Sequence, residues 1–205
     1  MVIRKVAIID FGAGNLRSIF NALDGIPGVR AEVTQSKSVI EQADFIVMPG
    51  VGAFDKAMIS LRRVDGLVEV LCDQVLVKNK PFLGICIGMQ ILADCGYENG
   101  ETRGLSFVAG EVRMLPRGGK SLLIPHMGWN NIVSEGMGMS QFCGQDFYFV
   151  HSYYFDASDG SDVVAYCDYG IKFPCILQKE NILATQFHPE KSGSQGVEFL
   201  KYFIR

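Results

Sequence analysis

Runs of apolar residues alternate with helical patterns along the first half of the chain. Lys5–Ile9 is almost continuously apolar, as in a strand that is buried on both faces of a parallel sheet. The next apolar residues, between Leu16 and Leu23, recur at helical spacing. Further strands are expected at Ala31–Val33, at Phe45–Met48 and from Phe82, and further helices at Asp55–Arg62, at Gly66–Lys78 and after Cys86. This β-α order predicts a parallel sheet with helices on both faces.

The second half of the chain has short apolar or alternating runs separated by Gly, Asn and Asp, as in hairpins. These runs are Val108–Leu115, Leu122–Ile124, Asn131–Val133, Phe147–Val150, Val163–Tyr166, Cys175–Gln178 and Ile182–Phe187. At the carboxyl end, an apolar stripe predicts a helix that starts with a capping box of Ser192 and Gln195. The expected fold is an open, mostly parallel α/β sheet with helices on both faces and added antiparallel strands, in one domain over residues 1–205.

Composition and charge narrow the class of protein. The 205 residues carry a net charge of −3, which gives no electrostatic footprint for nucleic acid. The chain contains no apolar run long enough to span a bilayer and begins without a hydrophobic signal region. Its six cysteines form no Cys-x-x-Cys pair, so we expect free thiols in the cytosol, with no metal site and no cofactor.

The most informative stretch lies where the strand from Phe82 meets the following helix. It reads Gly84-Ile85-Cys86-Ile87-Gly88. Glycines on either side of one polar residue at a strand-to-helix corner are typical of a nucleophile elbow, here with sulfur in place of a serine hydroxyl. The positive end of the helix would favour the thiolate form of Cys86. A buried cysteine that acts as a small hydrophobe is the alternative, but the paired glycines favour a nucleophile.

A second glycine-containing loop, Pro49–Phe54, follows the strand at Phe45–Met48. Loops at the carboxyl ends of parallel strands expose backbone N–H groups to ligands. We expect an N–H group of Val51 or Gly52 to form an oxyanion hole with that of Ile87. A plain turn is the alternative interpretation.

A candidate base for Cys86 comes near the end of the chain. His188 directly follows the apolar run Ile182–Phe187, and Pro189 favours an extended conformation at His188. In an extended segment, residues two apart face the same way, so Glu190 can reach the imidazole. A thiol, a base and a carboxylate that fixes the tautomer of the base are the parts of an activated nucleophile.

Two other functions fit less well. A dinucleotide site at Asp10–Asn15 lacks the third glycine of its motif, since Arg17 stands in that place. A zinc deaminase is excluded, because Pro174-Cys175 precedes His188 and Gln178 stands where a second cysteine ligand would be needed.

The stretch from Gly84 to Gln90, together with Phe187–Glu190, resembles the class I (triad) glutamine amidotransferases. Four other segments resemble the glutaminase subunits of imidazole glycerol phosphate synthases within that family. They are Ile9–Leu16, Pro49–Phe54, Pro125–Asn130 and Phe149–Tyr154. The resemblance extends from residue 9 to residue 192. Departures from the family pattern, such as Phe11 where tyrosine is common, do not affect the triad of Cys86, His188 and Glu190.

The resemblance implies that Cys86 attacks the side-chain amide of L-glutamine, His188 moves the proton and Glu190 orients His188. It also implies that Gly52, Gln90 and the backbone of Ser152 and Tyr153 bind the substrate. From the sequence alone, Gln90 could equally be a solvated helix residue.

The same resemblance implies a partner, the (β/α)8-barrel cyclase subunit of imidazole glycerol phosphate synthase, which uses the ammonia in histidine biosynthesis. Candidate interface residues are Asn15, His126, Trp129 and Lys191. A core aromatic is the alternative for Trp129, and a solvated side chain is the alternative for Lys191.

Three other functions stay open from the sequence. The chain could be a paralogous glutaminase subunit that serves another ammonia-using synthase. It could be a stand-alone cysteine hydrolase, which would turn over esters or peptides without a partner. A catalytically silent binding module is the third, and it is disfavoured because Cys86, His188 and Glu190 are all present.

Overall fold

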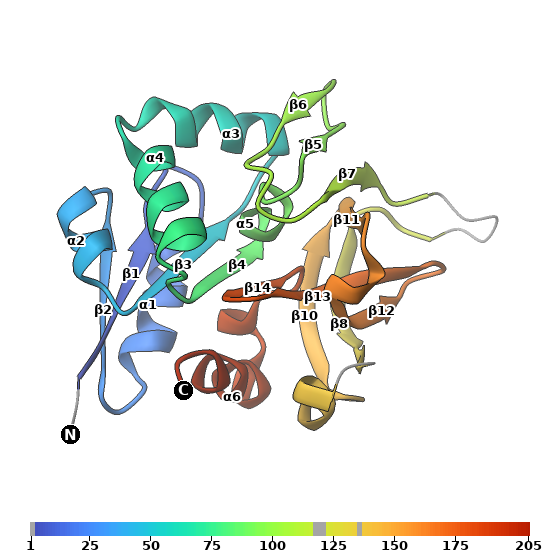
Figure 1. Ribbon diagram of the computed structural model, residues 1–205. Helices are drawn as coiled ribbons and strands as arrows, with labels where there is room; N and C mark the ends of the chain where they lie inside the picture. Colours follow the sequence, from blue (N-terminus) through green and yellow to red (C-terminus); the bar gives the residue numbers. More distant parts are fainter. Residues whose placement is uncertain (1–2, 117–121, 135–136) are drawn as a thin grey trace.

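The computed structural model describes residues 3–116, 122–134 and 137–205 (Figure 1). Its main sheet has eight strands in the order β2-β1-β3-β4-β14-β13-β12-β9. Neighbouring strands from β2 to β14 are parallel, and those from β14 to β9 are antiparallel. The strands are β1 Arg4–Ile9, β2 Val29–Thr34, β3 Phe45–Gly50, β4 Phe82–Cys86, β9 Val133–Ser134, β12 Val163–Asp168, β13 Lys172–Lys179 and β14 Ile182–Thr185. The predicted mostly parallel sheet with added antiparallel strands is confirmed.

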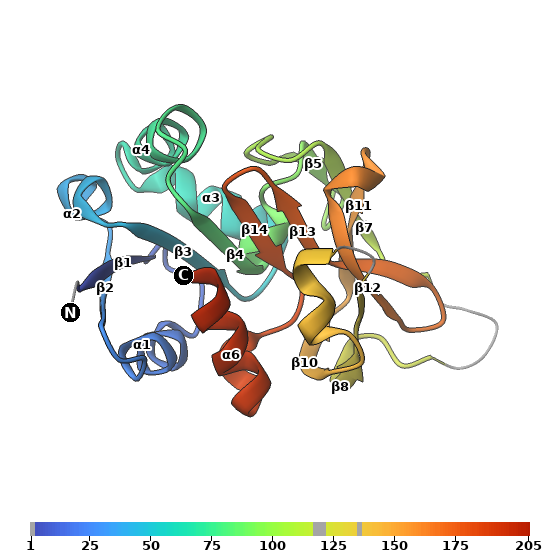
Figure 2. The same cartoon turned by 60° about the horizontal axis from the view of Figure 1, so that its bottom comes forward.

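Helices cover both faces of this sheet, as Figure 2 shows. On one face lie α1 (Leu16–Asp24) and α6 (Gly193–Phe203), which contact each other. On the other lie α2 (Lys37–Gln42), α3 (Phe54–Arg63) and α4 (Leu67–Cys72), and a π-helical turn at Asp73–Val77 continues α4. Each long helix turns an apolar stripe toward the sheet, and this burial is the main source of its stability.

Two smaller sheets stand beside the carboxyl ends of β4 and β14 (Figure 1). One pairs β8 (His126–Asn131) with β10 (Asp146–His151). The other has the order β11-β7-β5-β6. Its strands are β5 Cys95–Gly96, β6 Thr102–Arg103, β7 Gly110–Met114 and β11 Tyr153–Ala157. Together these sheets lie opposite the elbow. The strand β11 contacts both the short helix α5 (Ile87–Gln90) and β13.

Local predictions fail where tertiary hydrogen bonds take over. The helix after Cys86 is only four residues long, because the carbonyls of Ile91, Leu92 and Ala93 accept hydrogen bonds from the backbone of residues 105–108. So short a helix aligns few peptide dipoles, which weakens the expected help of its positive end to a Cys86 thiolate. Leu122–Ile124 is not a strand. The predicted Asn131–Val133 strand is divided, because β8 ends at Asn131 and β9 begins at Val133.

The predicted capping box at the start of α6 is also wrong. Ser192 occupies the cap position, but its hydroxyl makes no capping hydrogen bond. That hydroxyl instead donates to the carbonyl of His188 at 2.6 Å and accepts from the N–H group of Tyr148 at 3.0 Å. Ser192 is therefore used to tie the segment around His188 to β10.

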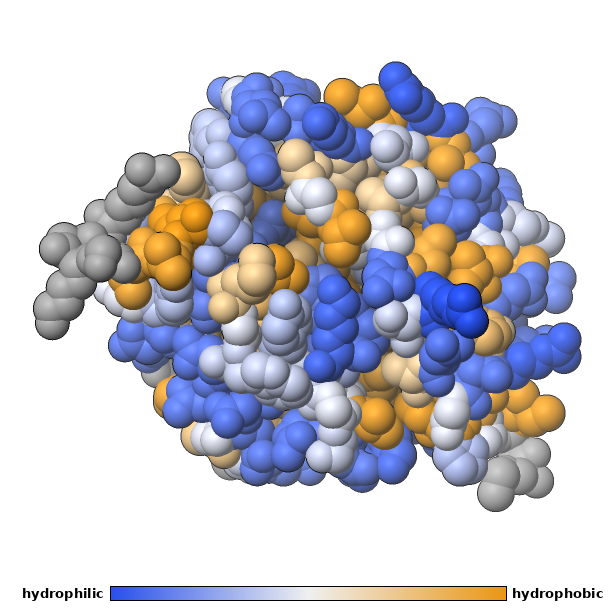
Figure 3. All heavy atoms as spheres, turned by 180° about the vertical axis from the view of Figure 1, so that it is seen from behind, coloured by the Kyte–Doolittle hydropathy of each residue, from blue (hydrophilic) through white to orange (hydrophobic). Residues whose placement is uncertain are grey.

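The outer surface is mixed in character. Figure 3 shows, on the face seen from behind, small hydrophobic patches separated by hydrophilic side chains. Scattered apolar residues of this kind are normal on a folded protein. Among the described residues, the helices are all too short or too polar to cross a membrane.

Glycines allow β3, β4 and α5 to pack at backbone distance. A Cβ atom on Gly88 would lie 1.8 Å from the carbonyl oxygen of Met48, and one on Gly84 would lie 2.5 Å from the carbonyl oxygen of Gly88. Real Cβ atoms do not approach backbone this closely, so both positions require glycine. This close packing is what lets the chain turn from β4 into α5 directly at Cys86.

We predict that Gly88→Ala lowers the free energy of unfolding by about 2 kcal/mol or more, because the backbone of β3 would have to move. The control is Gly160→Ala, where a Cβ meets nothing within 4 Å and the change should stay within about 0.5 kcal/mol. Urea unfolding of both variants measures the difference. Equal stabilities would show that the elbow is not packed as described.

Candidate active site

Cys86 sits at the strained corner between β4 and α5. Its backbone has φ 55° and ψ −108°, which is uncommon for a residue with a side chain. Such strain persists where the surroundings enforce it, and here the flanking glycines hold the corner against β3. The side chain is 4% exposed and lines a pocket at the carboxyl ends of the parallel strands. The predicted elbow geometry is therefore present.

Strand register brings the far end of the chain to this corner. β14 pairs with β4 in parallel, with Thr185 opposite Ile85. The residues that follow, Cys86 on one strand and Gln186 on the other, therefore leave the sheet side by side. The backbone of His188 is then fixed from both sides. Its N–H group donates to the carbonyl of Tyr148 at 2.9 Å, and its carbonyl accepts the hydroxyl of Ser192.

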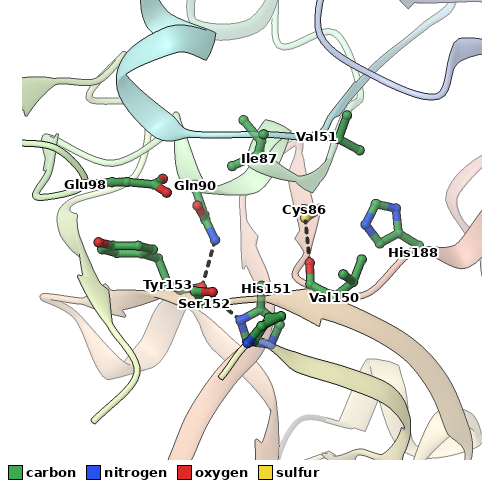
Figure 4. Close-up of a pocket in the computed structure, with 12 residues that line it drawn as sticks. Val51, Cys86, Ile87, Gln90, Glu98, Val150, His151, Ser152, Tyr153 and His188 are labelled. Carbon is green, nitrogen blue, oxygen red and sulfur yellow. Dashed lines mark hydrogen bonds between the residues drawn. The ribbon is translucent and has the colours of Figure 1, made fainter. Parts of the chain in front are cut away.

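Glu190 holds the imidazole in one orientation. Nδ1 of His188 lies 2.8 Å from Oε1 of Glu190, and the two side chains are only 2% and 3% exposed. Because a carboxylate can only accept, Nδ1 carries the proton of this hydrogen bond. Nε2 is left for the pocket, and in the described part of the chain it has no hydrogen-bond partner. Figure 4 shows the ring pointing toward the sulfur of Cys86.

The electrostatics of His188 couple it to Cys86. Burial by itself lowers the pKa of His188, but the charge and proximity of Cys86, followed by the hydrogen bond and charge of Glu190, raise it to about 10. The thiol of Cys86 donates instead to the carbonyl of Val150, at a sulfur–oxygen distance of 3.9 Å. Thiol and imidazole are thus neighbours in the resting arrangement, and a ring with so high a pKa takes up a proton beside Cys86 and keeps it at neutral pH.

Two glutamines support the thiol on its other side. Nε2 of Gln90 donates to the carbonyl of Tyr153 at 2.9 Å and to Oε1 of Gln186 at 3.0 Å. Nε2 of Gln186 in turn lies 3.7 Å from the sulfur of Cys86. Gln90 is 1% exposed, so the solvated alternative for this residue is wrong. Gln186 was not among the predicted site residues, although pairing the two strands in sequence would have placed it beside Cys86.

The pocket has a volume of about 360 Å³ and is of the size that takes a small metabolite. Cys86 and His188 share its lining with the remaining predicted site residues, which are Val51, Gly52, Ile87, Gln90, Ser152 and Tyr153. The structure thus brings these residues together, and their individual roles stay predictions. Within the described residues, no group of three His, Cys, Asp or Glu side chains could hold a metal ion.

Glu98 lines the same pocket and was missed, because no motif surrounds it in the sequence. One of its oxygens accepts the N–H group of Phe54 at 2.9 Å, which fixes the carboxylate. Burial raises the pKa of Glu98, the N–H group of Phe54 opposes that shift, and Asp55 adds to it. A carboxylate at this position can receive a positively charged group of a ligand.

The four predicted interface residues differ in exposure. Asn15, Trp129 and Lys191 are exposed, so the core alternative for Trp129 is wrong. Tyr148 links two of them, since its ring lies 6.1 Å from that of Trp129 and 5.9 Å from Nζ of Lys191. His126 is only 2% exposed and stacks between rings of its own chain, which does not fit a surface contact. We withdraw it from the predicted interface.

Comparisons with known proteins agree with this geometry. The family model for class-I glutamine amidotransferases matches residues 7–205. The chain is 41% identical to the imidazole glycerol phosphate synthase subunit HisH of Rhodospirillum rubrum, over 98% of each chain. It is 45% identical to the HisH subunit of Methanothermobacter thermautotrophicus, over 97% of each chain.

Solved structures share the fold at lower identity. A structure described as PurLQS from Thermotoga maritima matches with a TM-score of 0.77 at 14% identity, over 98% of each chain. A structure described as a glutamine amidotransferase matches with a TM-score of 0.70 at 21% identity, over 97% of this chain and 96% of the other. With the elbow, the family match and these relatives together, the chain belongs to the class-I glutamine amidotransferases and, within them, to the family of HisH subunits of imidazole glycerol phosphate synthase.

Proposed function

We propose that this chain hydrolyses L-glutamine to glutamate and ammonia through a thioester on Cys86. The ammonia passes to a (β/α)8-barrel cyclase subunit, which makes imidazole glycerol phosphate and aminoimidazole carboxamide ribotide in L-histidine biosynthesis. The observation that carries this proposal is the buried arrangement of Cys86, His188 and Glu190 around one small pocket. The names of the HisH relatives, similar over nearly the whole chain, support the histidine pathway over a paralogous synthase.

The reaction begins with the sulfur of Cys86 attacking the side-chain carbonyl of glutamine. Nε2 of His188 holds the proton that the thiol has lost and then gives it to the departing ammonia, which leaves a glutamyl thioester. Water then attacks the thioester, with His188 again acting as the base, and glutamate is released. The hydrogen bond to Glu190 stabilises the imidazolium that forms in each half of the reaction.

Backbone and side-chain groups around the pocket suit both ends of glutamine. We assign the N–H group of Ile87 and one from Val51 or Gly52 to the oxyanion of the tetrahedral intermediate. Glu98 would accept hydrogen bonds from the α-ammonium group, as would the buried Oε1 of Gln90, which has no partner among the residues that the structure describes. Ser152 and Tyr153 line the same pocket, and we assign their N–H groups to the α-carboxylate.

The fate of ammonia explains the need for a partner. Free ammonia in neutral water is mostly protonated and is then no nucleophile, so a shielded path to the acceptor favours synthesis. We propose that the cyclase docks over Asn15, Trp129 and Lys191, where an exposed tryptophan offers an interface anchor. We further propose that residues 1–205 work as one domain, since the family match spans 7–205. We also propose a cytosolic location, where the six free cysteines would stay reduced.

The first test separates glutamine use from synthesis. In the complex with the cyclase, Cys86→Ala should abolish product formation from glutamine, because no thioester can form, while synthesis from added ammonium salt continues. Product formation is measured with each nitrogen source, and glutamate release by wild type is measured with and without the cyclase. Strong hydrolysis by the chain alone would favour a stand-alone hydrolase.

The matched control is Cys143→Ala, which removes an exposed thiol and should leave both reactions unchanged. Glutamine-dependent synthesis that survives Cys86→Ala would remove Cys86 as the nucleophile. Loss of ammonia-dependent synthesis in the same variant would contradict separate sites for the two steps.

The second test concerns the carboxylate. Glu190→Gln keeps the shape of the side chain but removes the charge that stabilises the His188 imidazolium, so kcat for glutamine hydrolysis should fall by about 10²- to 10⁴-fold. Steady-state kinetics of the complex measure this, with Glu198→Gln as the control, because Glu198 pairs with Lys201 on the surface. A Glu190→Gln variant that retains a large share of wild-type kcat would rule out this role.

A further inference from the structure

Two buried histidines lie next to the pocket, and the proposed reaction does not use them. His126 on β8 and His151 at the end of β10 are directly opposite each other in the antiparallel pair. Nδ1 of His126 is 3.0 Å from Nε2 of His151, and the two residues are 2% and 6% exposed. Buried polar atoms cost free energy unless they are hydrogen-bonded, so each ring nitrogen needs a defined partner.

The partners determine where each proton lies. Nδ1 of His151 is 2.8 Å from the carbonyl oxygen of Tyr153, which can only accept, so this nitrogen carries the proton. In a neutral ring Nε2 of His151 is then an acceptor, and Nδ1 of His126 must donate to it. Nε2 of His126 is left as an acceptor for the amide of Asn130, 3.4 Å away. Along the series Asn130–His126–His151–Tyr153, each residue therefore donates a hydrogen bond to the next, and the series runs from β8 toward the pocket.

Both rings stay neutral at physiological pH. Burial lowers the pKa of His126 to about 4. Burial also lowers the pKa of His151, the hydrogen bond to Tyr153 opposes it, and the nearby His126 and His188 add to the lowering, which leaves a value of about 3. The series of hydrogen bonds requires neutral rings, because each ring must accept one hydrogen bond and donate one, and an imidazolium has two donors and no acceptor.

This series of hydrogen bonds ends on the carbonyl oxygen of Tyr153, the atom that sets the position of Gln90. The carbonyl oxygen of Tyr153 accepts from both His151 and Gln90, and Gln90 also holds Gln186 against Cys86. Figure 4 shows Gln90 and Tyr153 on one side of Cys86, with the His151 ring beneath them. A shift of the His151 ring would change the support of this carbonyl and, through it, the Oε1 atom that Gln90 presents to the pocket.

We propose that His151 and His126 are positioning residues for the substrate, a neutral imidazole pair in the Nδ1–H form that holds the Tyr153 carbonyl and Gln90 in place for binding an amino acid. This role rests on the proposed glutamine hydrolysis. The pair also connects the pocket to β8, whose exposed Trp129 we assign to the partner interface.

A packing role alone would not need these nitrogens. His126 stacks against Tyr169 at 4.0 Å and Phe149 at 4.9 Å between ring centroids, and a phenyl ring could fill such a place. Only an imidazole can both accept from Asn130 and donate to His151. The two roles therefore make different predictions for variants that keep the ring volume or keep one nitrogen.

The first measurement is nitrogen NMR of the full chain labelled at histidine, between about pH 6 and pH 8. We expect a protonated Nδ1 and an unprotonated Nε2 in both His126 and His151, with no titration in this range. An Nε2–H form of either ring, or titration near neutral pH, would overturn the chain of hydrogen bonds. This result does not depend on any enzymatic activity.

The second measurement is steady-state kinetics of the complex with the cyclase. His151→Asn places an amide near Nδ1 and can keep the bond to Tyr153, so KM for glutamine should stay within about threefold of wild type. His151→Gln carries its amide out toward Nε2 and loses that bond, so KM should rise about tenfold or more with little change in kcat. His126→Phe should raise KM in the same way.

The control for packing is Phe149→Leu, which loses a ring against His126 but no hydrogen bond, and it should leave KM unchanged. Equal KM values for His151→Asn and His151→Gln would overturn the positioning role, as would an unchanged KM in His126→Phe. If one variant does not fold, the NMR result on wild type still decides. A wild-type complex that releases no glutamate would instead remove the proposed function, whatever the tautomers.

Discussion

The parallel register of β4 and β14 is the constraint on which the rest of the site depends. With Ile85 opposite Thr185, Cys86 and Gln186 leave the sheet as neighbours, and His188 follows within reach of the thiol. About half of the chain separates these residues in sequence, so bringing them together costs the conformational entropy of closing a long loop. The site therefore exists only in the completed sheet, and the glycine contacts among β3, β4 and α5 place the thiol within it.

Burial acts differently on the three histidines, according to the neighbours of each. His188 is buried beside Cys86 and Glu190, whose charges favour the protonated ring and outweigh desolvation. His126 and His151 are hydrogen-bonded to each other and to neutral groups, and the nearby His188 lowers the pKa of His151 further, so desolvation dominates and both rings are neutral. The same type of side chain can thus be positively charged at one position of the site and fix the direction of hydrogen bonds at another.

The sequence was sufficient for the parts of the site that depend on local geometry. The glycines around Cys86 predicted the elbow, and the spacing of His188 and Glu190 predicted that the two side chains meet. The expected extended geometry holds only at His188, because Pro189–Lys191 forms a 3-10 turn. It was not sufficient where partners come from distant strands. Glu98 and Gln186 lie in no motif, Ser192 bonds to His188 rather than capping α6, and His126 is buried by rings from three other segments.

The measurement that tests the convergence of Cys86 and His188 most directly is an NMR pH titration of the His188 ring in wild type and in Cys86→Ala, with Cys143→Ala as the control. The pKa of His188 is raised to about 10 in the folded chain, so the ring holds its proton at neutral pH. The stabilisation this gives is complete below the unfolded value of about 6.5 and is lost as the pH rises through the folded value. Without the Cys86 sulfur, a cause that raises the pKa of His188 is lost while burial still lowers it, so the titration midpoint should fall. An identical midpoint in wild type and Cys86→Ala would contradict the pairing of thiol and imidazole.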